Sequence, residues 1–289
     1  MEKIRGREFT EERAFFGAAD VTVSDCTIGK GESPFKHSKK IILENSTVSS
    51  KYPLWYSEDA LVTGSVFEQT ARAGIWYSRG VRIRDTKILA PKTFRRCDGV
   101  ELGDVAIPDA QETFWSCANI KIRNLEAAGA DYIFMNSSGI DIDGMKLDGR
   151  YAFDGASDVV IRNAKIGTKD AFWNSKNITV YDSTISSEYI GWNSENVTFV
   201  RCTVESLQGF CYIKDLKLVD CRLPETTLAF EYSTVDADVR GDIGSVLDPA
   251  GGVIKADSIG TLTVRERYVD PESTKIEAEV KRRTEEPEF

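Results

Sequence analysis

The sequence predicts an all-β fold, a single-stranded right-handed parallel β-helix in which each coil of the chain stacks on the one before it. Three observations lead to this prediction. Residues of one character recur every 19 or 20 positions, alternate apolar residues mark a short strand in each repeat, and a phenylalanine column precedes these strands. A single repeat cannot bury its own apolar face, but stacked repeats share one continuous core.

The predicted strand of each repeat starts at an apolar residue. These starts are Val21, Ile41, Leu61, Val81, Val100, Ile120, Ile140, Val159, Ile178, Val197 and Leu216. Two positions later the residue is again apolar in all but one repeat, whereas polar residues such as Arg82, Glu101 and Lys121 lie between. Alternation with a period of two is typical of a strand with one buried face.

Six residues before each strand start, most repeats carry a large aromatic residue. This column holds Phe15, Phe35, Trp55, Ile75, Phe94, Phe114, Phe134, Phe153, Phe172, Gly191 and Phe210. We expect it to form a stacked ladder in the core, so truncation of Phe134 to alanine should cost about 3 to 5 kcal/mol.

The residue directly before each strand start predicts a sharp corner. It is most often Gly, Asn or Asp, as in Gly80, Asn119 and Asp158. These residue types tolerate the left-handed backbone conformation that a corner requires. Leucine-rich repeats share the period, but their regularly spaced Leu and Asn positions are missing.

The columns predict one elongated domain of about twelve coils. We place the β-helix at residues 14–264, a polar N-terminal cap at residues 1–13, and a charged C-terminal cap or tail at residues 265–289. The N-terminal cap would cover the open strand edge at that end of the β-helix. Five of the six cysteines, Cys26, Cys97, Cys117, Cys202 and Cys221, stand in columns of small residues and are expected to be buried free thiols that fill the core.

Composition excludes several function classes. The net charge is −9 at neutral pH, which argues against nucleic-acid binding because that binding depends on Lys and Arg at phosphates. The N-terminus lacks the apolar run of a signal peptide, and no window is long and apolar enough for a membrane span. We therefore expect a cytoplasmic protein with no membrane partner.

Several aromatic-rich motifs identify a family resemblance. They are Lys36-His37, Trp55-Tyr56, Ala73-Gly74-Ile75-Trp76, Phe94-Arg95-Arg96-Cys97-Asp98, Phe153-Asp154-Gly155-Ala156, Gln208-Gly209-Phe210-Cys211-Tyr212 and Leu228-Ala229-Phe230-Glu231-Tyr232-Ser233. In these motifs, and over nearly its whole length, the sequence resembles a bacterial family known as domain of unknown function 3737. The resemblance implies a β-helix of the pectin-lyase-like superfamily, and it implies no activity.

The residue after each core aromatic is expected to point outward, and this column is the candidate ligand-binding face. It includes Lys36, Tyr56, Trp76, Arg95, Trp115, Trp173 and Trp192. The first five would span about 19 Å at ~4.8 Å per coil. Aromatic faces stack on sugar rings and cations donate to hydroxyls, so the column predicts binding of an oligosaccharide or a similar small ligand. His37, Tyr77 and Arg96 in the next column would extend the site and help to hold an anion.

Two alternatives remain open for this face. The aromatic residues could instead form an interface between copies of the chain or be covered by the C-terminal segment, because large exposed aromatic patches usually mark interfaces. The chain could also be a carbohydrate-active enzyme. Asp154 would be its acid because its column neighbours are apolar, Asp170 would be the partner carboxyl, and Glu112 and Glu58 are more distant candidates.

Metal and cofactor chemistry finds no support in the sequence. His37 is the only histidine, so one chain cannot build a histidine-based triad or a site with several histidine ligands. Adjacent repeats also lack the clustered Asp residues that a calcium-dependent lyase requires. We expect no metal and no cofactor.

Overall fold

The structure, a computed structural model, describes residues 2–286 and is built from 25 strands with no helix in that range. It is an all-β parallel β-solenoid with about 15 coils and a period of about 19 residues, which confirms the predicted fold class. The coils outnumber the expected twelve because both ends of the chain also form paired strands. Two compact units, Met1–Gly149 and Arg150–Phe289, are described separately below.

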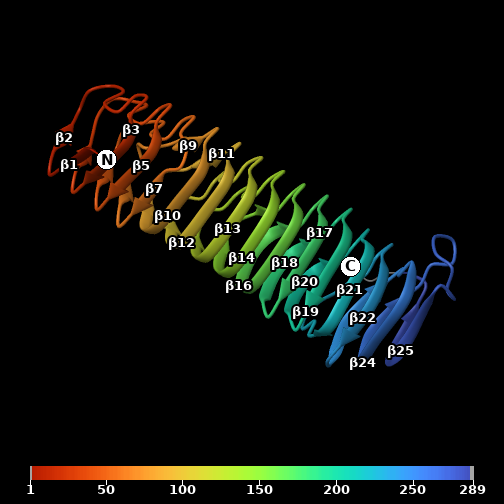
Figure 1. The fold of residues 1–289 in the computed structure, drawn as a ribbon. Coiled ribbons are helices and arrows are strands. Elements are labelled where there is room, and N and C mark those ends of the chain that lie inside the picture. The colour runs from red at the N-terminus through yellow and green to blue at the C-terminus, as the bar shows by residue number, and fades with distance from the viewer. Residues whose placement is uncertain (1, 287–289) are drawn as a thin grey trace. The chain divides into compact units, whose positions relative to one another are not determined.

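The strands of the first unit pair in parallel with their equivalents one coil away (Figure 1). They are β1 (Glu2–Arg5), β2 (Glu8–Phe9), β3 (Ala19–Ser24), β4 (Thr27–Ile28), β5 (Lys39–Glu44), β6 (Thr47–Val48), β7 (Leu61–Thr63), β8 (Val66–Phe67), β9 (Ile75–Trp76), β10 (Arg79–Ile88), β11 (Phe94–Arg95), β12 (Asp98–Ile107), β13 (Ala118–Ala127) and β14 (Ser138–Asp148).

The second unit repeats the same pairing. Its strands are β15 (Tyr151–Ala152), β16 (Ser157–Ala171), β17 (Lys176–Tyr181), β18 (Thr184–Ile190), β19 (Glu195–Val200), β20 (Thr203–Gly209), β21 (Lys214–Cys221), β22 (Thr234–Val239), β23 (Asp242–Leu247), β24 (Gly251–Thr263) and β25 (Thr274–Thr284).

The predicted phenylalanine ladder forms the core of each unit. In the first unit the rings of Phe94 and Phe114 stack with centroids 4.6 Å apart, and those of Phe114 and Phe134 stack at 4.8 Å. In the second unit Phe153 and Phe172 stack at 5.1 Å. All five rings are fully buried. The ladder is built this way because the spacing between coils matches the preferred distance between stacked aromatic rings.

Gly191 interrupts the ladder of the second unit, and a ring from the strand column takes its place. Phe199 packs edge-on against both Phe172, at 6.2 Å, and Phe210, at 5.4 Å. A Cβ atom on Gly191 would lie 2.4 Å from Cδ1 of Ile213. Glycine at this position therefore leaves room for the side chains of Phe199 and Ile213.

The predicted corners are present, and asparagine ladders reinforce them. Asn119, Asp158 and Asn177 all have positive φ angles close to 55°. The Asn177 side chain donates to Asp158 at 2.9 Å, and that of Asn196 donates to Asn177 at 2.9 Å. The asparagine corners are thus held by a side-chain hydrogen bond to the coil before them, in addition to the backbone conformation that this residue type tolerates.

The third coil departs from the predicted register by one residue. Leu61 pairs with the outward-facing Ile42, and the neighbour of buried Leu43 is Val62. Earlier in the same coil, Leu54 is buried in the core position assigned to Trp55, which is only half-buried. The column assignment failed here because Leu61 and Val62 are both apolar, so the sequence does not show which of them faces the core. A one-residue shift turns every side chain of a strand to the opposite face.

Both terminal segments contain paired strands. β1 and β2, in the segment predicted as a polar cap, pair with β3 and β4 of the following coil. β25, in the segment predicted as a charged cap or tail, pairs along β24. Residue 1 of the first segment and residues 287–289 of the second lie outside the described residues. All six cysteines are buried and have free thiols.

Candidate functional site

Four flat side chains of the first unit form a stacked row that we call the tryptophan ladder: Trp55, Trp76, Arg95 and Trp115. The indole rings of Trp55 and Trp76 lie 5.2 Å apart and almost parallel, at 8°. The Arg95 guanidinium lies 4.6 Å from the Trp76 ring centre and 4.9 Å from that of Trp115. Both faces of Trp76 are therefore covered by neighbours in the same row.

The polar groups of the tryptophan ladder are also largely bonded. Nε1 of Trp76 donates to the Lys92 carbonyl oxygen at 2.9 Å. The Glu112 carboxylate accepts from both Arg95 and Lys92, at 2.8 Å each. Nε of Arg95 is buried without a hydrogen-bond partner. Glu112, proposed from the sequence as a distant catalytic candidate, is thus engaged in holding a cation between two indoles.

A second row, which we call the tyrosine ladder, runs beside the first and contains His37, Tyr56, Tyr77 and Arg96. The Tyr56 ring stacks on His37 at 5.1 Å and on Tyr77 at 4.9 Å. Arg96 lies 5.9 Å from the Tyr77 ring centre, and the ammonium of Lys36 lies 5.8 Å from that of Tyr56. The polar and aromatic residues predicted in this unit therefore do come together.

Their arrangement differs from a row of open aromatic faces. Trp76 and Trp115 are half-buried, and Tyr56, though 43% exposed, has a ring on each face. Stacking between coils turns the edges of these rings outward, whereas a sugar needs their faces. The sequence columns placed the residues on neighbouring coils, but they could not show that the rings would stack on one another.

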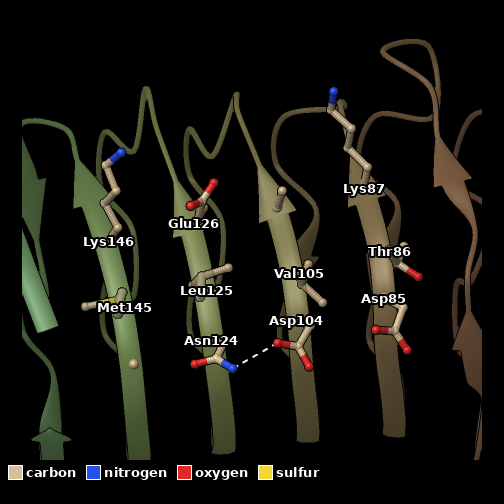
Figure 2. A pocket seen from close by; sticks show the side chains of 12 residues that line it. Asp85, Thr86, Lys87, Asp104, Val105, Asn124, Leu125, Glu126, Met145 and Lys146 are labelled. Atoms are coloured by element: carbon tan, nitrogen blue, oxygen red, sulfur yellow. Dashed lines mark hydrogen bonds between the residues drawn. The ribbon is translucent and has the colours of Figure 1, made fainter. Parts of the chain in front are cut away.

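A shallow groove of about 600 Å³ lies on another part of the first unit (Figure 2). Asp85, Asp104 and Asn124 follow one edge of the groove, and Asn124 donates to Asp104 at 2.8 Å. Lys87 and Lys146 are on the opposite edge. The groove is lined by no aromatic residue, and charges of both signs are interleaved along it, so it offers no pronounced preference for one ligand class.

The second unit contains a pocket of about 470 Å³, which we call the Trp173 pocket. Its lining residues are Tyr151, Lys169, Asp170, Trp173, Tyr189, Trp192 and Gln208. Strand pairing places four of them in one column, since Tyr151 pairs with Asp170, Asp170 with Tyr189, and Tyr189 with Gln208. Trp173 and Trp192 follow three residues after Asp170 and Tyr189, in the turns beyond β16 and β18. The pocket therefore lies between a strand column and a turn column.

Aromatic rings at several angles form much of the wall of the Trp173 pocket. Trp173 and Trp192 are tilted by 52° with centroids 6.4 Å apart, and Tyr189 meets Trp192 edge-on at 6.1 Å. Trp173 is 38% exposed, and within residues 2–286 no stacked ring or cation covers it. Unlike Trp76, which is covered on both faces, it presents an open face.

Asp170 places a carboxyl group among these rings. Only 8% of the residue is exposed, and its side chain has no hydrogen-bond or ion-pair partner within residues 2–286. Burial raises the pKa of Asp170, the charges of Glu188 and Asp154 raise it further, and Lys169 opposes the shift. The carboxyl is largely but not fully enclosed, since its oxygens are not among the buried polar atoms that lack a partner, and a partly desolvated carboxyl with a shifted pKa marks a candidate functional site.

Asp154, the other carboxyl predicted from the sequence, lies near this pocket without lining it. It is half-buried, and burial raises its pKa while a hydrogen bond with Asn174 lowers it. The effect of its charge on the pKa of Asp170 shows that the two carboxyls influence one another. Both environments favour the protonated form, as expected for groups that exchange protons with a ligand.

Tyr151, Lys169, Tyr189 and Gln208 were missed by the sequence analysis, although Asp170, Trp173 and Trp192 were found. The four missed residues belong to the column eight residues before each strand start or stand next to it. That column contains both aromatic and charged residues, and together with the outward column it holds every lining residue of the pocket except Lys169.

The Gln208 side chain is hydrogen-bonded to a buried ionic network. Nε2 of Gln208 donates to Glu231 at 2.7 Å, and Glu231 also contacts the Arg265 guanidinium at 3.4 Å. Arg265 donates from Nε to Asp248 at 2.5 Å. Burial raises the pKa of Glu231. The loop after β24 is thereby linked to one wall of the Trp173 pocket.

Two kinds of feature are missing from residues 2–286. No group of three or more His, Cys, Asp or Glu side chains gathers there in a way that could hold a metal ion. The same residues include no helix long and apolar enough to cross a membrane.

Comparison with known proteins found a matching family model and a distant likeness to a solved structure. The model of the family described as "Protein of unknown function (DUF3737)" matches residues 2–277. The crystal structure of PfbA, a surface adhesin of Streptococcus pneumoniae, aligns with a TM-score of 0.40 and 9% identity, covering 94% of this chain and 86% of that one. Among curated proteins, none matches.

Proposed function

We propose that this chain, which belongs to the DUF3737 family, binds a carbohydrate in the Trp173 pocket. One observation carries the proposal: the open face of Trp173 lies in the same pocket as the unpartnered carboxyl of Asp170. Sugars combine an apolar ring face, which stacks on indole, with hydroxyl groups that need hydrogen-bond partners. The pocket supplies both kinds of contact.

Other features of the pocket suit the same ligand class. Gln208, Tyr189 and Lys169 add an amide, a hydroxyl and an ammonium around the ring faces. The volume of about 470 Å³ falls within the range of about 300 to 1,000 Å³ that is typical of small-molecule sites. Strand pairing holds Asp170 and Tyr189 on neighbouring strands, so much of the site is formed before the ligand arrives.

A glycan array probed with the full chain tests this proposal. We expect the array to show bound glycans for the natural protein, and Trp173→Ala to lose them because it removes the stacking face. Trp115→Ala is the matched control, since it removes an indole whose face is already covered by Arg95. Equal loss in both variants, or binding that persists in Trp173→Ala, would contradict the assignment of the site.

A second candidate function, hydrolysis of a glycosidic bond, is favoured by the two interacting carboxyls. Burial raises the pKa of both Asp170 and Asp154. A protonated carboxyl can donate a proton to the leaving oxygen while a second carboxyl assists, as in known glycosidases. Release of reducing ends from the glycans that bind on the array tests it. We expect Asp170→Asn to abolish release.

A further inference from the structure

We infer that the sugar bound in the Trp173 pocket carries a protonated amine, so that its class is an amino sugar. This inference rests on the proposed function and adds the charge of the ligand. It comes from comparing equivalent columns of the two units. In the first unit a cation built into the chain, Arg95, stands one coil before the carboxylate, and in the second unit the equivalent position is held by an acid, Asp154.

The built-in cation of the first unit is Arg95. Its guanidinium lies between Trp76 and Trp115 and donates to Glu112 at 2.8 Å. Lys92 bonds the other oxygen of Glu112. One carboxylate and two indoles thus hold a cation, which is the combination that cation–π attraction and charge pairing favour.

In the second unit the same two columns carry the carboxylate and the indoles without the arginine. Asp170 stands eight residues before its strand start, as Glu112 does, and Trp173 stands five residues before, as Trp115 does. No Arg or Lys side chain of the described chain lies over Trp173 or Trp192. The Asp170 carboxyl also has no bonded cation, in contrast to Glu112.

The charges around the pocket favour a cation as well. The Asp170 carboxyl is influenced by two other acids, Asp154 and Glu188, and by a single base, Lys169. Lys169 is exposed, so its ammonium is largely solvated. A ligand ammonium would neutralise part of this negative charge, and it would give Asp170 the partner that the chain does not provide.

An amine on a sugar satisfies these conditions together. The ring face of the sugar stacks on Trp173, and the amine points to the carboxyl of Asp170. Trp173 and Trp192 are tilted by 52° and lie on adjacent coils, whereas two coils separate Trp76 from Trp115. Trp173 and Trp192 therefore do not form a parallel pair that could enclose a cation. We expect the ligand amine to lie beside Asp170 and next to the indoles.

Isothermal titration calorimetry with two matched probes tests the inference. The probes are a fully deacetylated glucosamine oligosaccharide and the same oligosaccharide with every amine acetylated, titrated below neutral pH so that free amines are protonated. We expect the amine form to bind at least about tenfold more tightly, equivalent to about 1.4 kcal/mol. Asp170→Asn should remove this preference, and Asp182→Asn should keep it because Asp182 is an exposed residue bonded to Arg201.

The outcomes separate the inference from the function on which it rests. If both probes bind equally well and Trp173→Ala abolishes both, the charge inference is overturned and carbohydrate binding stands. If the preference persists in Asp170→Asn, the cation is not recognised by this carboxyl and the inference is again overturned. Binding of neither probe, with no glycan retained on the array, would overturn both. Trp173→Ala alters an exposed side chain, so a folded variant is expected, and circular dichroism checks it.

Discussion

Arg265 and Asp248 form a buried ion pair that joins the loop after β24 to the body of the second unit. The Asp248 side chain is fully buried and accepts two hydrogen bonds from Arg265, one from the backbone N–H at 2.7 Å and one from Nε at 2.5 Å. The Arg265 guanidinium also lies 4.8 Å from the Tyr268 ring centre. The loop is therefore docked through one residue with several partners.

Removal of the Arg265 charge should destabilise the protein strongly. Arg265→Met leaves the Asp248 carboxylate buried without its cation, and breaking a buried pair in this way costs about 3 to 5 kcal/mol. Urea unfolding followed by circular dichroism measures the loss. Arg201→Met is the control, because its pair with Asp182 is solvent-exposed, and its urea midpoint should stay nearly unchanged. Similar urea midpoints for the two variants would show that the buried ion pair stabilises the protein no more than the exposed pair does.

Truncation of the core ladder should be equally costly. Phe114→Ala removes a fully buried ring that stacks on Phe94 and Phe134, and we expect a loss of about 3 to 5 kcal/mol in the free energy of unfolding. Phe16, which is 50% exposed, provides the control, and its replacement by alanine should change stability by less than about 0.5 kcal/mol. The same urea titration compares the two, and a small loss in Phe114→Ala would argue against the ladder.

Gly191→Ala should be destabilising for two separable reasons. Its φ angle of +72° costs an alanine about 1 to 2 kcal/mol, and the new Cβ meets Cδ1 of Ile213 at 2.4 Å. Ile213→Val removes that Cδ1 atom. We therefore expect the double variant to be more stable than the sum of the two single losses predicts. Strict additivity in a double-mutant cycle would show that the clash contributes nothing.

The acids near the Trp173 pocket should make stability depend on pH. Burial raises the pKa of Asp154 and Asp170 above their ordinary value of 3.8, so the folded protein holds these protons to higher pH than the unfolded chain does. Their stabilising contribution is fully present below that value and is lost as pH rises through the raised pKa values. In Asp154→Asn/Asp170→Asn this loss should disappear. Urea unfolding across a pH series measures the free energy of unfolding of both proteins. We expect the stability of the double variant, relative to the natural protein, to increase with pH. Parallel plots of stability against pH would show that the two acids do not link stability to pH.

The cysteines should resist alkylation in the folded protein. All six thiols are buried and out of reach of the reagent, and burial also raises the pKa of Cys117 and raises that of Cys211 to about 12, so these two hold little reactive thiolate. Mass spectrometry after iodoacetamide treatment in mildly alkaline buffer should find native protein unmodified and urea-unfolded protein labelled at all six thiols. Rapid labelling of Cys211 in the folded state would contradict its burial.

Much of the candidate site could be anticipated from columns, and the reasons for the rest are physical. Trp173 and Trp192 were found because outward positions repeat with the period of the coil, and Asp170 was found as the carboxyl nearest to Asp154, one coil onward. Tyr151 and Gln208 were missed because they approach the indoles from a different column, across a turn. The open face of Trp173 and the covered faces of Trp76 could not be distinguished, since the two tryptophans occupy equivalent positions in the sequence.

The sequence by itself determined the β-helix, its period, its phenylalanine core and its corners. Each of these is a local preference repeated in many coils, so that single exceptions such as Gly191 do not hide the pattern. The tertiary structure decided the register of the third coil, the stacking of Trp76 on Arg95, the pocket around Asp170 and the docking of Arg265 on Asp248. These depend on which side chains meet between coils, and a one-residue shift or a side-chain rotation alters them without altering the period.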